Sequence, residues 1–442
     1  MTLGGIVMLI KQNVLYGSNV LDNPVIQTHG NQFLRFEGKC HNSGSYFSLT
    51  KEQLSAHLAL IGSTFSGKTN TLKSVIFQLK SKLGPNDIMI VFDSKYDFRD
   101  FHGHNDFVIS NCQSSRATNV NWNIFGDITS DGWDFESIYL NAIELAKVAF
   151  EDRIKKSTQP FFPQAAMEIF AAVITAMALI GSDDKDFRLN QLNNYELRRY
   201  LRKLDAKKLA DFLGKFPELT GVLKYVGNGR SDQALGVFAE LEEGAIFLTS
   251  IFAKKGSFSI RRATRNRGGR TIFLEYDPSY GTLGIPLRMV TDLPLKEALS
   301  PKNKKGNVYV IIDEFKMLSP LNYIENALNF GRSLGVSVIV GIQSIEQLYE
   351  TYGEYRGKNI LSGFQSSFVF RTNNSATREY VKGINGQNLT NIQYLDAAQK
   401  PKDTIREGNV IEDWNITSLN QGQAIISLPS TKPFIFQFSK YK

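Results

Sequence analysis

Short, mainly apolar runs recur along the chain, and several are followed by a polar or glycine-containing turn and then by a segment with helical periodicity. The first of these runs leads into Gly62. The later ones span 87–93, 271–276, 307–315, 336–341 and 366–371. Runs that are apolar at nearly every position are typical of strands buried on both faces, as in a parallel sheet covered by helices. The pattern predicts an α/β fold with a mostly parallel sheet.

The first of these runs leads into the segment 58–72, which reads LALIGSTFSGKTNTL. It contains the phosphate-binding pattern GxxxxGK[ST] between a predicted strand and a predicted helix. The candidate phosphate-binding residues are Gly62, Ser63, Thr64, Phe65, Ser66, Gly67, Lys68 and Thr69. Glycines let backbone N–H groups turn towards a phosphate, and the helix N-terminus adds partial positive charge. We expect Lys68 to contact the β- and γ-phosphates of ATP and Thr69 to bind Mg²⁺.

A second part of a nucleotide site is predicted at 307–315, NVYVIIDEF. This strand ends in Asp313 and Glu314. A P-loop enzyme needs a carboxylate at a strand end near Mg²⁺, and hydrolysis needs a second carboxylate that polarises water. We therefore expect Asp313 to serve the metal and Glu314 to act as the catalytic carboxylate.

Two further catalytic candidates follow along the chain. Arg332 lies near the end of a predicted helix over 321–334. It either favours the helix C-terminus electrostatically or serves as an arginine finger for the γ-phosphate of a neighbouring subunit. Gln343 follows the strand 336–341, where its amide could touch both the γ-phosphate and the attacking water.

The domain organisation follows from a change of periodicity. From about 134 to 242 the pattern is helical with few strand signals. We expect a β-rich lead-in over 1–49, a first part of the nucleotide-binding domain over 50–133, an inserted all-α domain over 134–242, and a second part over 243–442 that ends in a β tail. The fold class is thus a RecA-like P-loop core interrupted by an all-α insertion.

Charge adds a candidate for an anionic partner. The chain has 51 Lys and Arg against 43 Asp and Glu, a formal net charge of +8. One basic cluster spans 198–208 and a second spans 261–270. The first is either a solvated helix face or a nucleic-acid contact, and the second suits either phosphate contacts or a subunit interface.

Membrane and redox signals are weak. The apolar opening over 4–10 is too short to span a bilayer, and the run 169–181 between acidic residues predicts a buried helix. Cys40 and Cys112 are too few for a disulfide framework, which suits a cytoplasmic protein.

Over about residues 45 to 435, the order of motifs resembles the type IV secretion and conjugation coupling proteins, within the FtsK/HerA class of RecA-like DNA-pumping ATPases. The motifs are GSTFSGKTNTL (62–72), IVFDSKYDF (90–98), VNWNIFGDI (120–128), RTIFLEYDPSYG (270–281), VIIDEF (310–315), GRSLGVSVIVGIQSIEQLYETYG (331–353) and FVFRTNNSATREYV (368–381). The last two are the most specific, because generic ATPases do not share them.

The resemblance implies a homo-hexameric ring that uses ATP and Mg²⁺ and holds DNA in its central channel. It assigns the arginine finger to Arg332 and the glutamine sensor to Gln343. It also implies that the helical domain meets a relaxase or other cargo and that the ring works with components of the secretion channel. Two features depart from the family: Phe65 stands where glycine is usual, and the typical amino-terminal membrane helices are absent. We therefore expect a separate membrane subunit to recruit the protein to the inner face of the cytoplasmic membrane.

The leading hypothesis is an ATPase that drives DNA translocation and, as a coupling protein, delivers DNA and relaxase to a type IV secretion channel. One alternative is an FtsK/HerA-like motor for DNA processing, defence or packaging. Another is a nucleotide-gated assembly scaffold that does not pump DNA.

Overall fold

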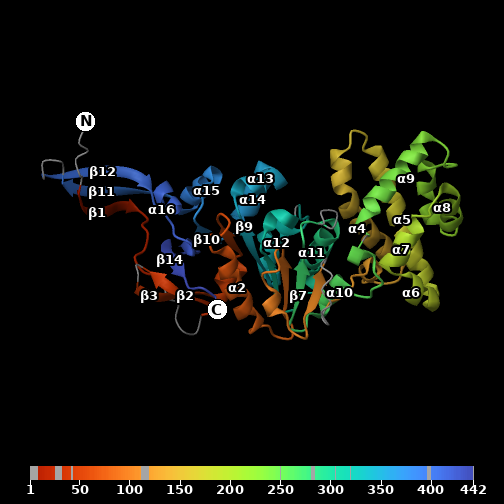
Figure 1. Ribbon diagram of the computed structural model, residues 1–442, viewed down its shortest axis with the longest axis horizontal. Coiled ribbons are helices and arrows are strands. Elements are labelled where there is room, and N and C mark those ends of the chain that lie inside the picture. Colours follow the sequence, from red (N-terminus) through yellow and green to blue (C-terminus); the bar gives the residue numbers. More distant parts are fainter. Residues whose placement is uncertain are drawn as a thin grey trace. The chain divides into compact units, whose positions relative to one another are not determined.

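The computed structural model describes residues 8–24, 32–40, 43–110, 119–248, 250–279, 284–303, 305–318, 320–395 and 400–441 (Figure 1). The chain forms two compact units. Unit 1 comprises Met1–Lys82, Val310–Lys316 and Glu325–Lys442, and unit 2 comprises Leu83–Tyr309 and Met317–Ile324. Each unit is assembled from segments that are distant in sequence.

The main sheet of unit 1 mixes parallel and antiparallel strands. Its strand order is β3 (Ser43–Leu49), β2 (Leu34–Cys40), β14 (Phe434–Phe438), β13 (Gln423–Ser427), β10 (Ser366–Phe370), β4 (Leu58–Ile61), β9 (Val336–Ile342) and β8 (Val308–Ile312). Strands β10, β4 and β9 are parallel, whereas β13, β14, β2 and β3 continue the sheet in antiparallel fashion. The C-terminal strands β13 and β14 therefore add to the parallel strands beside β10 and lie between β10 and β2.

The parallel and antiparallel strands differ in burial. Every residue of β4 and β9 is buried, as expected for strands covered on both faces. In β2 buried and more exposed positions largely alternate, which is typical of a strand with one solvated face. Aromatic rings close the core beneath the antiparallel part, where the ring centroids of Phe47 and Phe436 lie 4.8 Å apart and those of Phe36 and Phe47 lie 5.0 Å apart.

A separate three-stranded antiparallel sheet also belongs to unit 1 (Figure 1). Its order is β1 (Met8–Gly17), β11 (Gln387–Leu395) and β12 (Pro401–Asn409). β structure is predicted from the sequence in the lead-in, whereas β11 and β12 are not predicted. These two strands are rich in Asn, Gln and charged residues, so no apolar run marks them.

The helices of unit 1 surround the main sheet. They are α1 (Lys51–Ser55), α2 (Lys68–Lys80), α12 (Ile324–Phe330), α13 (Ile345–Tyr352), α14 (Glu354–Ser362), α15 (Ser375–Asn385) and α16 (Asp413–Thr417). The helix predicted over 321–334 is shorter than expected: α12 passes into a 3-10 turn, Gly331–Leu334, which ends at Gly335 with a φ of 80°. A left-handed residue at this position ends a helix without a steric penalty when it is glycine.

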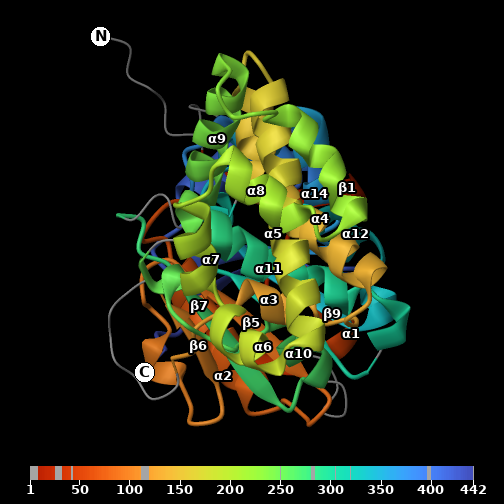
Figure 2. The same cartoon turned by 90° about the vertical axis from the view of Figure 1, so that its right-hand side faces the viewer.

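Unit 2 combines a small parallel sheet with most of the helices. Its strands pair in the order β5 (Ile88–Asp93), β7 (Arg270–Glu275) and β6 (Phe107–Ser110). Its α-helices are α3 (Ile124–Ile128), α4 (Phe135–Lys156), α5 (Phe161–Asp183), α6 (Lys185–Gln191), α7 (Asn194–Leu201), α8 (Ala206–Leu213), α9 (Asp232–Gly244), α10 (Ile260–Asn266) and α11 (Gly284–Ala298). Helix α5 packs against α4 and α9 (Figure 2).

Helix α5 is the one described helix that is long and apolar enough to cross a membrane. Of its most apolar window, 72% is buried inside the protein. It is therefore a core helix of unit 2, in agreement with the prediction from the run 169–181. The long run of helices between β6 and β7 corresponds to the expected insertion, while its boundaries at 134 and 242 stay predictions.

Candidate nucleotide site

The P-loop connects β4 to α2, the strand-to-helix junction that the motif requires. Gly62 has a φ of 156° and Gly67 a φ of 122°. A Cβ at Gly62 would lie 2.7 Å from Cβ of Phe370, and a Cβ at Gly67 would lie 2.8 Å from Cα of Gly422. Both positions thus require glycine for backbone conformation and for close approach.

Lys68 is buried at the first position of α2. Its ammonium donates to the carbonyl oxygens of Gly62 at 2.5 Å and Ser63 at 3.0 Å. These bonds fold the side chain back over the loop, with the amino terminus of a 13-residue helix beside it. The ammonium and the helix terminus place positive charge where phosphate oxygens would bind.

Thr69 and Asp313 come together from segments far apart in sequence. The Thr69 hydroxyl donates to Oδ1 of Asp313 at 3.4 Å, and Asp313 is only 3% exposed. A hydroxyl and a carboxylate are the hard oxygen ligands that suit Mg²⁺, which takes its remaining ligands from phosphates and water. The two residues fit the predicted metal role, and Mg²⁺ bound there would neutralise charge on the phosphates.

Glu314 and Gln343 form the second pair of the site. Nε2 of Gln343 donates to Oε2 of Glu314 at 2.5 Å. Glu314 is 6% exposed and directly follows the metal candidate Asp313. The amide therefore orients the carboxylate that is expected to polarise water, and it links the ends of β8 and β9.

Arg332 does not belong to this group within one chain. It is exposed and precedes β9, whereas the P-loop follows β4, which runs parallel to β9. Hydrogen bonds lower the pKa of Glu52 and burial lowers the pKa of His57, and the nearby charge of Arg332 adds to both shifts. Glu52 and His57 both precede β4. Arg332 thus lies at the amino-terminal edge of the strands, opposite the P-loop of its own subunit.

Phe65 is the unusual member of the loop. It has a φ of 59° and its side chain is 91% exposed. A left-handed conformation is strained for a bulky residue, which is why glycine is usual there. The loop therefore keeps the backbone path of a P-loop at the cost of some strain.

Residues that brace the P-loop through backbone hydrogen bonds are not among those predicted from the sequence. The Ser63 amide donates to the Arg371 carbonyl at 3.1 Å, and the Gly422 amide donates to the Ser66 carbonyl at 2.8 Å. Gly422 lies in the turn before β13, and its φ of 78° favours glycine. A single glycine in a polar tail carries no signal that it will contact a loop over 350 residues earlier.

In the second basic cluster, 261–270, Arg261 and Arg265 have a structural role. Arg261 and Arg265 donate to Glu297, each through Nε at 2.6 Å, and both also pair with Asp131. Side chains of Arg261 and Glu297 are 4% and 3% exposed. These two arginines hold α10 against α11 and are not available for a ligand.

The first basic cluster forms an exposed surface on α7 and α8. Arg199 pairs with Glu196 at 3.0 Å and Lys208 with Asp205 at 2.7 Å. Arg202, Lys203 and Lys207 are exposed. Some cations of this face are therefore paired with carboxylates, while others are exposed to solvent.

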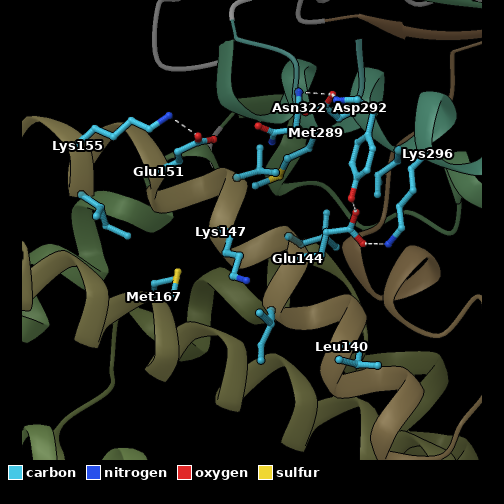
Figure 3. Close-up of a pocket in the computed structure, with 16 residues that line it drawn as sticks. Leu140, Glu144, Lys147, Glu151, Lys155, Met167, Met289, Asp292, Lys296 and Asn322 are labelled. Carbon is cyan, nitrogen blue, oxygen red and sulfur yellow. Dashed lines mark hydrogen bonds and ion pairs between the residues drawn. The ribbon is translucent and has the colours of Figure 1, made fainter. Parts of the chain in front are cut away.

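Unit 2 also contains a large cavity between α4 and α11 (Figure 3), with a volume of about 660 Å³. Glu144 accepts hydrogen bonds from Lys296 and from the Tyr323 hydroxyl, and Asp292 accepts one from the Asn322 amide at 2.9 Å. The carboxylates of Glu144 and Asp292 in its wall are therefore bonded to neighbouring polar groups.

Burial of Asp292 in this wall raises its pKa to about 7, because desolvation outweighs the backbone amides and Arg288, which favour the charged form. In unit 1, burial lowers the pKa of His57 to about 4. Both groups are therefore held in their neutral forms over part of the accessible pH range.

The fold and the site define the class of the protein. A P-loop whose metal-binding threonine meets a strand-end aspartate, beside a glutamate held by a glutamine, is the site of a RecA-like P-loop NTPase. Residues 43–428 match the family model of the type IV secretion-system coupling protein DNA-binding domain, and the chain belongs to this family. This family match confirms the predicted family, and with it the coupling-protein function and ATPase activity. A search of curated protein sequences returned no significant match.

Solved structures support the predicted fold class. The chain is similar to the bacterial conjugative coupling protein TrwBdeltaN70 in its unbound form, with a TM-score of 0.71 at 17% identity over 99% of this chain and 96% of that one. It is also similar to TrwB in complex with ADP and Mg²⁺, with a TM-score of 0.69 at 16% identity over 100% and 97% of the two chains. VirB4 of Thermoanaerobacter pseudethanolicus matches with a TM-score of 0.53 at 12% identity over 94% and 98%.

Proposed function

We propose that this protein hydrolyses ATP at the P-loop of unit 1 to drive DNA towards a type IV secretion channel. One arrangement carries the proposal: the pairs Thr69–Asp313 and Gln343–Glu314 lie beside Lys68 at one edge of a RecA-like sheet. TrwB, a relative of the same fold, has been solved with ADP and Mg²⁺. This supports ATP and Mg²⁺ as the ligands here.

Within this site each residue has a distinct role. Lys68 and the loop amides hold the β- and γ-phosphates, and Thr69 and Asp313 hold Mg²⁺, which supplies charge neutralisation when bound. Glu314 orients the attacking water and accepts its proton, and Gln343 fixes the carboxylate in place. Gln343 also reports the nucleotide state, since any group that displaces its amide frees Glu314.

Arg332 acts on a neighbouring subunit. Its position at the edge opposite its own P-loop supports an arginine finger supplied in trans, which requires a ring of identical subunits. A homo-hexamer with DNA in its channel meets this need. The exposed basic face on α7 and α8 suits contact with DNA or with cargo, such as a relaxase, at the helical part of unit 2.

We place the protein in the cytoplasm and expect a separate membrane subunit of the secretion apparatus to recruit it. A complex with channel components at the inner face of the cytoplasmic membrane would bring the DNA exit close to the channel.

The test is steady-state ATPase activity over a range of protein concentrations, with and without single- and double-stranded DNA. Lys68→Ala and Arg332→Ala are measured alone and as a mixture, with Arg35→Ala on β2 as a control at an exposed arginine. For a ring with shared sites, activity rises steeply with concentration and with DNA, and each of the first two variants is inactive alone. Their mixture regains activity, because a Lys68→Ala subunit can supply Arg332 to an intact P-loop.

Activity that ignores DNA and survives Arg332→Ala would contradict the motor and favour a scaffold that uses ATP within one subunit. Inactivity of the mixture, with both variants still assembling into rings, would contradict the trans role of Arg332. Retained activity in Lys68→Ala would remove the P-loop mechanism altogether.

A further inference from the structure

Unit 2 contains a second cavity, of about 590 Å³, at the amino-terminal ends of β6 and β7. Its volume is sufficient for a nucleotide-sized ligand. The charged and aromatic residues in its wall are Phe107, Lys255, Phe258, Arg262, Arg267 and Arg270. Among the described residues, the lining thus contains four cationic side chains and no carboxylate.

Arg267 is the buried cation of this wall. It is 3% exposed, and among the described residues its guanidinium donates to the carbonyl oxygens of Asn86 at 3.2 Å and Asn303 at 2.8 Å. Its Nε has no hydrogen-bond partner among the described residues. Desolvation lowers the pKa of Arg267, although the charge of Asp87 offsets part of the effect without forming an ion pair. A buried charge that lacks an ion-pair partner is costly, so an anion in the cavity would be stabilised.

Arg262 and Arg270 add charge at the opening. Both are exposed, and neither forms an ion pair within the part of the chain that the structure describes. Arg262 donates to the carbonyl and the hydroxyl of Thr129, both at 3.1 Å. The guanidinium of Arg270 lies 5.2 Å from the ring centroid of Phe107. These contacts hold the two side chains in position and leave their charge uncompensated.

Arg262 and Arg270 differ from their sequence neighbours in how their charge is compensated. Arg261 and Arg265 are neutralised by Glu297 and Asp131, so the protein pairs arginines with carboxylates where they serve the scaffold. Lys255, which also lines the cavity, lies 3.8 Å from Glu196 and 5.8 Å from the ring centroid of Tyr195. Positive charge therefore remains where the cavity opens.

An aromatic wall completes the cavity. The ring centroids of Phe107 and Phe258 lie 4.8 Å apart at an interplanar angle of 55°, and both rings are half-buried. Gly256 lets the loop before Phe258 close on Asn121, because a Cβ there would lie 2.2 Å from the Asn121 carbonyl oxygen. Arginines beside accessible rings suit phosphate together with a stacked base.

We propose that this cavity binds the phosphate groups of a nucleotide unit, carried by a DNA strand or by a free nucleotide. Arg262, Arg267 and Arg270 contact the phosphates, and Phe107 and Phe258 contact the base. The site is separate from the P-loop in residues and in unit. Its DNA form rests on the proposed function, since it would hold the strand that the motor moves.

The test compares charge reversal in the cavity with matched reversal elsewhere. Arg262→Glu/Arg270→Glu is compared with Lys224→Glu/Arg230→Glu, which reverses two exposed cations of unit 2 outside the cavity. Arg262→Gln/Arg270→Gln serves as a milder variant if charge reversal prevents folding. Binding of a labelled oligothymidylate is measured by anisotropy over a salt series, and binding of thymidine monophosphate is measured by calorimetry in the Lys68→Ala background.

If the ligand is a DNA strand, the cavity variants lose at least about tenfold in oligothymidylate affinity and the salt slope falls by about two, while the control changes far less. If it is a free nucleotide, thymidine monophosphate binds and the cavity variants abolish that binding. Equal effects of cavity and control variants, or no effect of either on both ligands, would overturn the proposal. Basal ATPase without DNA distinguishes the two failures, because it tests the P-loop and does not involve the cavity.

Discussion

The P-loop of unit 1 and the cavity of unit 2 lined by Arg262, Arg267 and Arg270 both present positive charge suited to phosphate, but they are built differently. The P-loop is one continuous segment in which Gly62 and Gly67 allow backbone amides to approach the ligand and a single lysine supplies charge. The cavity takes its cations from separate positions on a loop, a helix end and a strand start. A backbone site needs strict spacing and so leaves a motif, whereas a side-chain site needs only that long side chains converge.

The largest expected effect tests the catalytic side of this comparison. Glu314→Gln removes the general base while keeping the size of the side chain, so ATP turnover should fall about 10²- to 10⁴-fold. Nucleotide binding and oligothymidylate affinity should stay as in the parent. Steady-state ATPase and nucleotide titration check this, with Glu346→Gln on the exposed side of α13 as control. A parallel loss of DNA binding would mean that the two sites are not independent.

The next effect tests which arginines of unit 2 are scaffold. Glu297→Gln leaves buried Arg261 without its main counterion, so we expect a loss of about 3–5 kcal/mol in the free energy of unfolding. The side chain of Glu243, which pairs with Arg153, is 63% exposed. Glu243→Gln should therefore lower the free energy of unfolding by at most about 1 kcal/mol. Chemical denaturation measures both. Equal losses would show that the Arg261 network does not support the fold.

A third prediction concerns pH and unit 2. The pKa of Asp292 is about 7 in the folded protein against 3.8 ordinarily. Between these values the folded protein holds a proton that the unfolded chain has released, so this group makes stability fall as pH rises. Asp292→Asn removes the effect, and its stability relative to the parent should rise on the order of 2 kcal/mol between pH of about 5 and about 8.

His57 of unit 1 should act in the opposite direction. Burial lowers its pKa to about 4 from 6.5, so its stabilising effect is lost as pH falls through that window.

The control for Asp292 is Asp277→Asn, because hydrogen bonds from Ser279 lower the pKa of Asp277 and keep it charged throughout. A pH-independent difference between Asp292→Asn and the parent would refute the prediction.

The smallest effect concerns Phe65 at the tip of the P-loop. Phe65→Gly relieves a left-handed conformation at a residue that buries little surface, so the protein should gain up to about 1 kcal/mol in stability. Thermal unfolding without nucleotide measures this, with Phe77→Gly in α2 as a contrasting exposed phenylalanine that should destabilise. A loss of stability on Phe65→Gly would mean that the ring makes a stabilising contact.

Much of the nucleotide site could be predicted from the chain. Lys68, Thr69, Asp313 and Glu314 follow from a spaced motif and from an apolar strand that ends in carboxylates. The structure brings Thr69 against Asp313, and the roles of all four residues stay predictions. The roles of Arg332 and Gln343 rest on resemblance to a family. The structure adds that Gln343 contacts Glu314 and that Arg332 lies at the opposite edge, but their catalytic roles stay predictions.

Other features depend on pairings that no local pattern encodes. The polar strands β11 and β12 form a sheet with β1 because their backbones pair, although their side chains carry no strand signal. Adjacent arginines separate into a buried network and a cavity wall according to which carboxylates the fold brings near.

The sequence alone determined the α/β class, the P-loop and the carboxylate pair, because strand burial and phosphate binding impose short-range constraints on residue type and spacing. Only the tertiary structure decided that Gly422 braces the loop, that Arg261 is part of a structural network and that Arg267 is buried with no ion-pair partner among the described residues. Those outcomes depend on distances between segments remote in sequence, and charge balance in a folded interior is set by such neighbours.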